Sequence, residues 1–357
     1  TVGGVADYTA ILSRRLVEVS DGGVEPVLVH AGRQPADAIE VDFPVVDLSG
    51  QCSASALADS VRRLAERANG RAVVLLEYSG YGYAKRGAPL WLARGLHRVR
   101  GEHAVPLVTM FHELYATGPP WTSAFWYSLM QRYVTAQLAQ LSTEVVTNRE
   151  NAVSWLVNRG HRRDDSVHVQ PVFSNVGEPA TVPTFGRRDP YIVVFGGGGR
   201  KRRIYEQKMP VLRHLIGRLR FERVVDIGPS EKVQKGEGDL IEFCGLLPAE
   251  AVSAKLRTAS LGVISYPASR LGKSGAASAF ASHGVPFILF DEDSASQNAG
   301  PYTEGNHFIR SENTGSRGVD LSRGRLKEMG QSIRRLYQTH LHSSRAARCI
   351  LDRLDST

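Results

Sequence analysis

The feature that most constrains this fold is a regular alternation of short apolar runs with longer amphipathic stretches. The runs are rich in valine, leucine and isoleucine and lack the polar alternation of a half-exposed strand. Such runs are typical of strands buried on both faces of a parallel sheet, with helices as crossovers. They lie at residues 27–30, 72–76, 106–110, 144–147, 191–195, 223–227, 260–264 and 285–290. The sequence therefore predicts an α/β protein.

The chain is long enough for two such sheets. Its 357 residues exceed the roughly 250–300 at which one core usually stops growing. Helices are predicted between the strands, for example at 8–19, 56–68, 125–141 and 248–258. A stretch at 173–189 rich in proline, glycine and polar residues has the composition of a linker.

We therefore expect an N-terminal domain over residues 1–178 and a C-terminal domain over 179–340. Residues 341–357 are expected to form a helix that packs back on the N-terminal domain. The sequence starts at a glycine-rich turn, where a Rossmann-like half would have a strand feeding that turn. We expect this first strand to lie upstream of Thr1.

Composition restricts the class of protein. The chain is 42% hydrophobic and 22% charged, as in ordinary globular proteins, and no apolar run reaches the ~18 residues of a membrane span. The first residues do not resemble a signal peptide. Three scattered cysteines lack metal-ligand spacing. These features predict a cytoplasmic protein.

The formal charge of +8 is unevenly distributed. Residues 1–50 hold 3 basic and 8 acidic side chains, whereas residues 51–100 hold 9 basic and 3 acidic ones. The basic segment is either a solvated face or a surface that attracts phosphate. With Trp91, Arg94, His97 and Arg98 on one predicted helix, it could rest on the inner face of an anionic membrane. No nucleic-acid recognition motif accompanies the charge.

Two glycine-rich turns are candidate anion sites. Gly3 and Gly4 precede the first predicted helix, and four glycines ending at Gly199 follow the strand at 191–195. Glycine lets backbone N–H groups approach a ligand closely. The second turn is followed by Arg200, Lys201, Arg202 and Arg203, whose charges can neutralise a diphosphate. A solvated helix start explains part of this cationic run.

Two further turns follow strands of the second half. Lys273, Ser274 and Gly275 place a cation, a hydroxyl and N–H groups at a helix N-terminus, either as an anion site or as a plain serine cap. Gly245 and Leu246 form a strand-to-helix turn whose main chain could read a nucleobase edge.

In the first half, His112 follows the strand at 106–110, at the edge where ligands of open α/β sheets bind. Its imidazole could bind a sugar hydroxyl or accept a proton. The next loop carries Trp121, which could stack on a sugar or acceptor or simply pack. Residues 291–293 formally match D-x-D, a divalent-metal pattern. Late in the chain, they are expected to be solvated acids, and we expect no metal.

Taken together, these segments resemble the GT-B glycosyltransferases of the large retaining class, family 4, that includes bacterial mannosyltransferases and exopolysaccharide transferases. The segments that carry the resemblance are GGVADYT, EYSGYGYAKRGAP, FHELYATGPPW, FSNVGEP, VVFGGGGR, DIGP, FCGLLPAEAVSAKL, SYPASRLGKSG and AFASHGVPFIL. The resemblance implies two Rossmann-like domains with parallel sheets facing a central cleft. It also implies metal-independent, retaining transfer of a sugar from a nucleotide-diphosphate sugar, UDP or GDP, to an acceptor hydroxyl.

The resemblance further implies polysaccharide or glycoconjugate synthesis with a sugar, a lipid-linked compound or a small molecule as acceptor, and no separate cofactor. His112 would touch the donor sugar, and Tyr8 and Trp121 would contact the acceptor. Donor binding would fall to Gly3, Gly4, Gly199, Arg200, Lys201, Arg203, Gly245, Leu246, Lys273, Ser274 and Gly275.

The sequence departs from the class at one motif. Its E-x7-E glutamates are replaced by Leu271 and Ala279, so the lysine-serine-glycine segment must bind the donor in another way. Two alternatives therefore stay open. One is a GT-B sugar-nucleotide epimerase, and the other is a non-catalytic GT-B partner protein that binds a nucleotide sugar.

Overall fold

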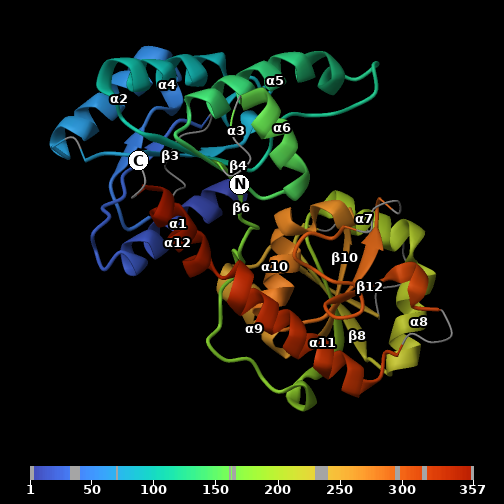
Figure 1. Ribbon diagram of the computed structural model, residues 1–357. Coiled ribbons are helices and arrows are strands. Elements are labelled where there is room, and N and C mark those ends of the chain that lie inside the picture. The colour runs from blue at the N-terminus through green and yellow to red at the C-terminus, as the bar shows by residue number, and fades with distance from the viewer. Residues whose placement is uncertain are drawn as a thin grey trace. The chain divides into compact units, whose positions relative to one another are not determined.

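The computed structural model describes residues 4–32, 41–69, 71–160, 162, 166–229, 240–293, 298–315 and 320–354. The chain divides into two compact units (Figure 1). The first unit comprises residues 1–170 together with 346–357, and the second comprises 171–345. The division thus falls ahead of the boundary expected after residue 178, and the chain from Ala346 onward belongs with the first unit.

The first unit contains two parallel sheets. The larger has the order β3-β4-β5-β6, and the smaller pairs β1 with β2. All five residues of β4 are buried, since this strand lies between two others and is rich in valine, leucine and methionine. The strands are β1 (Leu28–His30), β2 (Val45–Asp47), β3 (Val74–Tyr78), β4 (Leu107–Phe111), β5 (Glu144–Thr147) and β6 (Val167–Val169).

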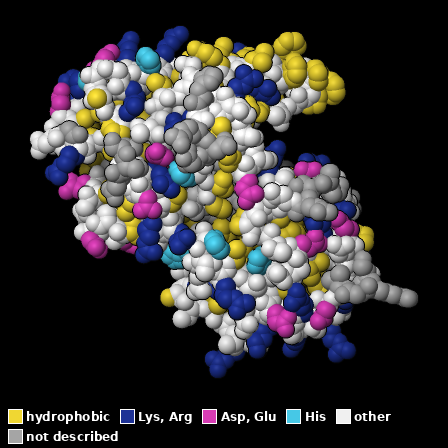
Figure 2. Space-filling model, viewed as in Figure 1, with side chains coloured by type: hydrophobic (Ala, Val, Ile, Leu, Met, Phe, Trp, Pro, Cys, Tyr) yellow, Lys and Arg dark blue, Asp and Glu magenta, His cyan; other side chains and the backbone are white. Residues whose placement is uncertain are grey.

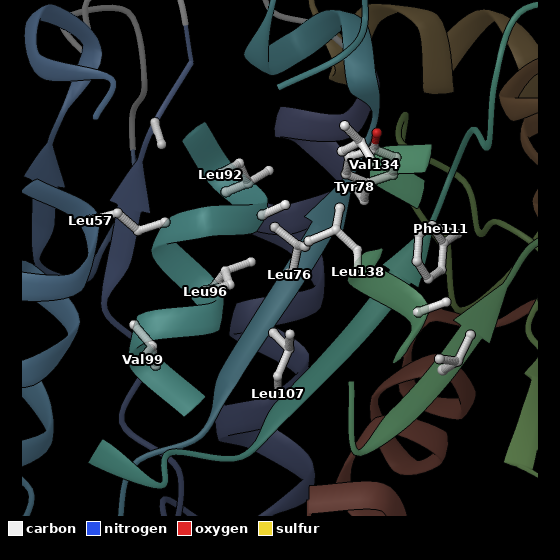
Figure 3. Close-up of a cluster of buried hydrophobic side chains, with 14 of the residues drawn as sticks. Leu57, Leu76, Tyr78, Leu92, Leu96, Val99, Leu107, Phe111, Val134 and Leu138 are labelled. Atoms are coloured by element: carbon white, nitrogen blue, oxygen red, sulfur yellow. The ribbon is translucent and has the colours of Figure 1, made fainter. Parts of the chain in front are cut away.

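Helices cover this sheet and bury their apolar faces against it. Leu76 and Leu107 of adjacent strands lie among Leu96 and Val99 of α4 and Leu138 of α5 (Figure 3). Ser53 begins α2 as its N-cap, where its hydroxyl accepts a hydrogen bond from the Ala56 amide. The helices are α1 (Gly4–Val19), η2 (Ser49–Gln51), α2 (Ala54–Arg67), α3 (Gly80–Tyr83), α4 (Leu90–His103), α5 (Ser123–Leu141) and α6 (Glu150–Gly160).

The second unit is built on one six-stranded parallel sheet with the order β12-β11-β10-β7-β8-β9. Of its central strands, β10 is buried except at Tyr266, and β7 is buried from Tyr191 to Val194. The strands are β7 (Asp189–Phe195), β8 (Arg223–Ile227), β9 (Ile241–Gly245), β10 (Ala259–Tyr266), β11 (Phe287–Asp291) and β12 (Phe308–Arg310).

The helices of the second unit are α7 (Gly198–Gln207), α8 (Met209–Leu219), α9 (Ala249–Thr258), α10 (Gly275–Ser282) and α11 (Arg323–Leu336), with α12 (Ser343–Leu354) continuing into the first unit's residues. Short 3₁₀ turns are η4 (Phe185–Arg187), η5 (Ala268–Lys273) and η6 (Ser311–Asn313), and η7 (Tyr337–Leu341) is a π-helical turn. None of the helices in the described part of the chain is long and apolar enough to cross a bilayer.

The first part of the expected linker is a packed element of the second unit. Phe173 is 2% exposed, and the neighbouring Val172 amide donates to the Gly272 carbonyl at 2.9 Å. Further along, the Glu178 carboxylate accepts hydrogen bonds from the Tyr337 hydroxyl and, at 2.8 Å, from the Ser343 amide. These contacts explain why the second unit starts at Pro171, well before the polar composition ends.

Candidate functional site

Three turns meet at the carboxyl edge of the second unit's sheet. They follow β7, β8 and β9, which are adjacent in the sheet. The Gly228 amide donates to the Gly245 carbonyl at 2.7 Å, and a Cβ at Gly228 would lie 2.6 Å from the Gly196 carbonyl oxygen. With a φ of +105°, this position requires glycine. The DIGP segment therefore holds the three turns close together.

Two of the glycines predicted to bind a donor leave backbone open at this edge. A Cβ at Gly199 or Gly245 would meet no atom within 4 Å. Leu246, beside Gly245, is 77% exposed. Open backbone at the carboxyl edge of a parallel sheet is where open α/β folds bind ligands, so the positions of these three residues suit the predicted role.

Arg200 and Arg203 are the exposed cations of this edge. Both lie on α7 and share the carboxylate of Glu292, which follows β11, at 3.2 and 2.6 Å respectively. The Arg200 guanidinium also stacks over the ring of Tyr266, the last residue of β10, at 4.0 Å from the centroid. Two guanidinium groups on one carboxylate leave a net positive charge, held in place by an aromatic face and an ion pair.

Lys201 occupies a different environment from its neighbours. It is 2% exposed, and its ammonium donates to Asp226 at 2.6 Å and to the Ile227 carbonyl at 3.2 Å. Asp226 is itself fully buried and also accepts from the Tyr205 hydroxyl, whose pKa is raised by burial and by this charge. Lys201 was predicted to contact the diphosphate. In the structure its ammonium forms an internal ion pair instead, because α7 directs the side chain beneath the carboxyl ends of the strands.

The lysine-serine-glycine segment lies at the start of α10. Ser274 is 3% exposed and caps the helix, accepting a hydrogen bond from the Ala277 amide at 3.2 Å. Lys273 ends the 3₁₀ turn η5 and is half-buried. Gly275 is partly exposed, and an added Cβ would only touch the Asn175 side chain at 3.7 Å. The serine therefore serves as a cap, while Lys273 and Gly275 stay candidates for donor binding.

The acidic segment after β11 differs from the solvated loop expected. The Asp291 carboxylate is fully buried, where it pairs with Arg310 at 3.0 Å and accepts from the Ala268 amide at 2.9 Å. Glu292 also accepts from the Ser265 hydroxyl at 3.0 Å. The Asp291 carboxylate can be buried because the Arg310 guanidinium compensates its charge. No group of three or more metal-binding side chains occurs among the residues with described positions.

In the first unit, His112 lies at the carboxyl edge of β4, as its sequence position predicted. It is 5% exposed, and its Nε2 lies 2.6 Å from the carboxylate of Glu77, near the end of the adjacent strand β3. The other carboxylate oxygen of Glu77 is buried and has no hydrogen-bond partner within the described structure. A buried histidine-carboxylate pair fixes the ring and its tautomer, as in general acid–base sites.

Tyr8 packs against this pair instead of forming an open surface. It is 4% exposed, and its ring meets His112 edge-on at 4.8 Å between centroids. Burial raises the pKa of its hydroxyl well above the usual range, with the Glu77 charge as a second cause. Its placement differs from the predicted acceptor contact and suits a role in positioning His112.

The first unit has three more predicted site residues. Gly4 begins α1, and a Cβ there would have open space around it. Trp121 is 83% exposed, in the loop before α5. Gly3 lies outside the described residues.

Several residues at the carboxyl edges of the two units' sheets were not predicted from sequence. Glu77, Asp226, Tyr266 and Glu292 all lie at or near the carboxyl ends of their strands. That position was the available signal, since acidic and aromatic residues at strand ends meet at one edge of a parallel sheet.

No protein-family model matches the sequence. No curated protein matches it either. Solved structures match most of this chain at low identity. A Listeria monocytogenes protein assigned as a UDP-N-acetylglucosamine 2-epimerase is 14% identical, with a TM-score of 0.60 over 98% of this chain and 93% of that one.

A glycosyltransferase from Rickettsia africae is 9% identical, with a TM-score of 0.59 over 100% of this chain and 96% of that one. A UDP-forming α,α-trehalose-phosphate synthase from Burkholderia vietnamiensis is 11% identical, with a TM-score of 0.55 over 88% and 82%. At sequence identities this low, the matches show similarity of the backbone fold alone. With its two parallel-sheet α/β units, the chain has the GT-B fold.

Proposed function

We propose that this protein is a glycosyltransferase that moves a hexosyl group from a nucleotide-diphosphate sugar to an acceptor hydroxyl. The observation that carries the proposal is the cationic carboxyl edge of the second unit. Arg200 and Arg203 share the single carboxylate of Glu292 there, beside the open backbone at Gly199 and Gly245. Two cations beside glycine backbone that a ligand can approach suit the binding of a diphosphate.

This arrangement supports chemistry by charge stabilisation. As the sugar–phosphate bond breaks, negative charge develops on the departing diphosphate, and guanidinium groups already in place stabilise it without reorganisation. The departing phosphate oxygen can then help to deprotonate the acceptor on the same face, which gives retention of configuration. We propose UDP or GDP as the donor nucleotide and a metal-independent reaction in the cytoplasm. The acceptor would be a sugar, a lipid-linked compound or a small molecule.

The His112–Glu77 pair supports a second candidate function, sugar-nucleotide epimerisation. An epimerase moves protons at the sugar and needs carboxylates and imidazoles for that purpose. The buried pair is such a group, and one oxygen of its carboxylate has no hydrogen-bond partner among the described residues. In a transferase, the same pair would orient a donor hydroxyl.

Product analysis distinguishes the two functions. The full chain is incubated with each of several UDP- and GDP-sugars, and the products are followed by NMR. A transferase releases nucleoside diphosphate as it transfers the sugar, slowly when water is the acceptor and faster when a pool of acceptors is added. An epimerase instead converts the intact nucleotide sugar to its epimer. Release of diphosphate without any epimer supports transfer. Epimer formation without release contradicts it.

The diphosphate site has a matched control within one helix. The side chains of Arg203 and Arg202 are both 56% exposed, but Arg202 pairs with Glu206 on the helix surface. We expect Arg203→Gln to raise the Kd for the donor by about tenfold or more, as for loss of one charge-assisted contact. Arg202→Gln should change it less than about twofold. Equal effects of the two substitutions would remove this site from the proposal.

A further inference from the structure

Helix α5 carries a large apolar face that is exposed in the described structure. Five bulky side chains at helical spacing lie on one side of its N-terminal half, and Trp121 precedes them in the adjoining loop. Figure 2 shows hydrophobic side chains gathered over this helix, with basic side chains beside them. We call the five residues the outer face of α5: Phe125 (43% exposed), Trp126 (69%), Leu129 (76%), Met130 (44%) and Tyr133 (56%).

The buried side of the same helix turns is largely polar. Ser128, Gln131 and Thr135 are buried there beside the apolar Val134. Gln131 donates to the Arg86 carbonyl at 2.8 Å and accepts from the Ala116 amide, while the Thr135 hydroxyl donates to the Leu114 carbonyl. The usual pattern of a surface helix is therefore inverted in these turns. Contiguous exposed apolar surface of this kind marks an interaction site.

Positive charge surrounds the outer face of α5. The Arg86 guanidinium stacks over Tyr127 of α5 at 4.6 Å, and that of Arg132 stacks over Tyr115 at 4.3 Å. Helix α4, which packs against α5, exposes Arg94, His97 and Arg98. Residues 78–101 and 114–143 hold six lysine and arginine residues and no aspartate or glutamate.

We propose that the outer face of α5, with Trp121 and the neighbouring cations, docks the protein on an anionic lipid bilayer. Tryptophan, phenylalanine, leucine and tyrosine beside arginine are the composition of helices that lie in the membrane interface. Each nearby cation adds attraction to anionic headgroups. The inference uses the first unit alone and does not depend on the proposed reaction.

The charge distribution favours a bilayer over a second copy of the chain. A symmetric dimer through this face would bring each arginine near its own symmetry mate or a neighbouring cation. With no carboxylate in residues 114–143, this surface offers no opposite charge to pair with them. An anionic surface satisfies the apolar and the basic residues at once.

Co-sedimentation of the full chain with lipid vesicles tests the proposal. We expect binding to phosphatidylcholine vesicles that contain phosphatidylglycerol, much weaker binding to pure phosphatidylcholine, and release by high salt. Entry of Trp121 and Trp126 into the interface should shift the tryptophan fluorescence to shorter wavelength. Leu129→Ser combined with Trp126→Ser should lower the partition coefficient by at least about tenfold.

The chain provides a matched control in Leu246, which is 77% exposed on the second unit. Leu246→Ser should bind vesicles like the wild type, and all variants should keep the wild-type unfolding temperature, since the changed side chains are exposed. Absence of wild-type binding at low salt overturns the proposal. Vesicle binding by the double variant that equals wild-type binding also overturns it. A wild-type dimer that the double variant dissociates, seen by analytical ultracentrifugation, would assign the face to self-association instead.

Discussion

At the scale of single residues, burial decides which cations of the site can meet a ligand. Arg200, Lys201 and Arg203 are close neighbours in sequence, and a cationic run gives no means to tell them apart. The structure separates them because α7 places Lys201 beneath the strand ends, against Asp226, and leaves the two arginines at the surface. The sequence predicted an anion site at this run of cations. It could not predict which of the cations faces inward.

The buried Lys201–Asp226 pair predicts a stability effect rather than a binding effect. Lys201→Met leaves a carboxylate that is 0% exposed without its ammonium partner. We expect a loss of about 3–5 kcal/mol in the free energy of unfolding, measured by urea titration. The double variant Lys201→Met/Asp226→Leu should lose less than the single one. Near-wild-type stability of Lys201→Met, together with lost donor affinity, would instead assign Lys201 to the diphosphate.

The His112–Glu77 pair shows a second limit of sequence reasoning at this scale. His112 was found because it directly follows a strand. Its partner lies 35 positions away in sequence, on a strand that becomes its neighbour only through the register that pairs Glu77 with Met110. A single sequence carries no record of that register.

At the scale of elements, the sequence predicted the buried strands well and the edge strands poorly. All eight predicted runs are strands, from β1 to β11, because continuous apolar runs match strands buried on both faces. The strands β2, β6, β9 and β12 are not among those runs, and each lies at a sheet edge. An edge strand is less buried than a central one and needs fewer apolar residues, so its sequence pattern is harder to recognise.

The start of α10 gives a prediction at this scale. Gly275→Ala adds a Cβ whose only near neighbour lies 3.7 Å away, and the backbone there is helical, so the fold should tolerate it. If a donor phosphate approaches the Gly275 amide, the methyl group should lower donor affinity by about tenfold. Calorimetric titration of wild type and variant measures this. Unchanged affinity would leave this helix start with a structural role only.

The end of α10 predicts a pH dependence of stability. His283 is fully buried, its Nδ1 lies 2.8 Å from the Ala279 carbonyl, and its Nε2 lies 2.7 Å from the Ser253 hydroxyl. Burial lowers its pKa to about 4, and nearby arginines, including Arg188 and Arg334, act in the same direction. The unfolded chain, with a histidine pKa near 6.5, therefore binds more protons between these values.

The stabilising effect of neutral His283 is thus fully present above about pH 6.5 and is lost as the pH falls toward 4. The loss is on the order of 3 kcal/mol. Urea unfolding at several pH values should show it, and the stability difference between wild type and His283→Asn should shrink as the pH falls. A difference that is constant over this range would contradict the assignment.

At the scale of the whole molecule, the chain uses two parallel-sheet units, each with polar groups at the carboxyl ends of its strands. The α/β class and the division into two units follow from chain length and strand pattern. The placement of the boundary did not follow from composition, because the start of the segment with linker composition, including Phe173 and Glu178, packs into the second unit. Packing partners far along the chain decide such a boundary.

The central claim is that the second unit binds a nucleoside diphosphate at Arg200 and Arg203. The most direct test is thermal unfolding of the full chain with a panel of UDP-, GDP-, ADP- and dTDP-sugars. A ligand that binds only the folded state at 100 times its Kd adds about 2.7 kcal/mol of stability. We predict a raised unfolding temperature with one nucleotide class, and loss of that rise in Arg200→Gln/Arg203→Gln. No rise with any member of the panel, or an equal rise in the double variant, would contradict the claim.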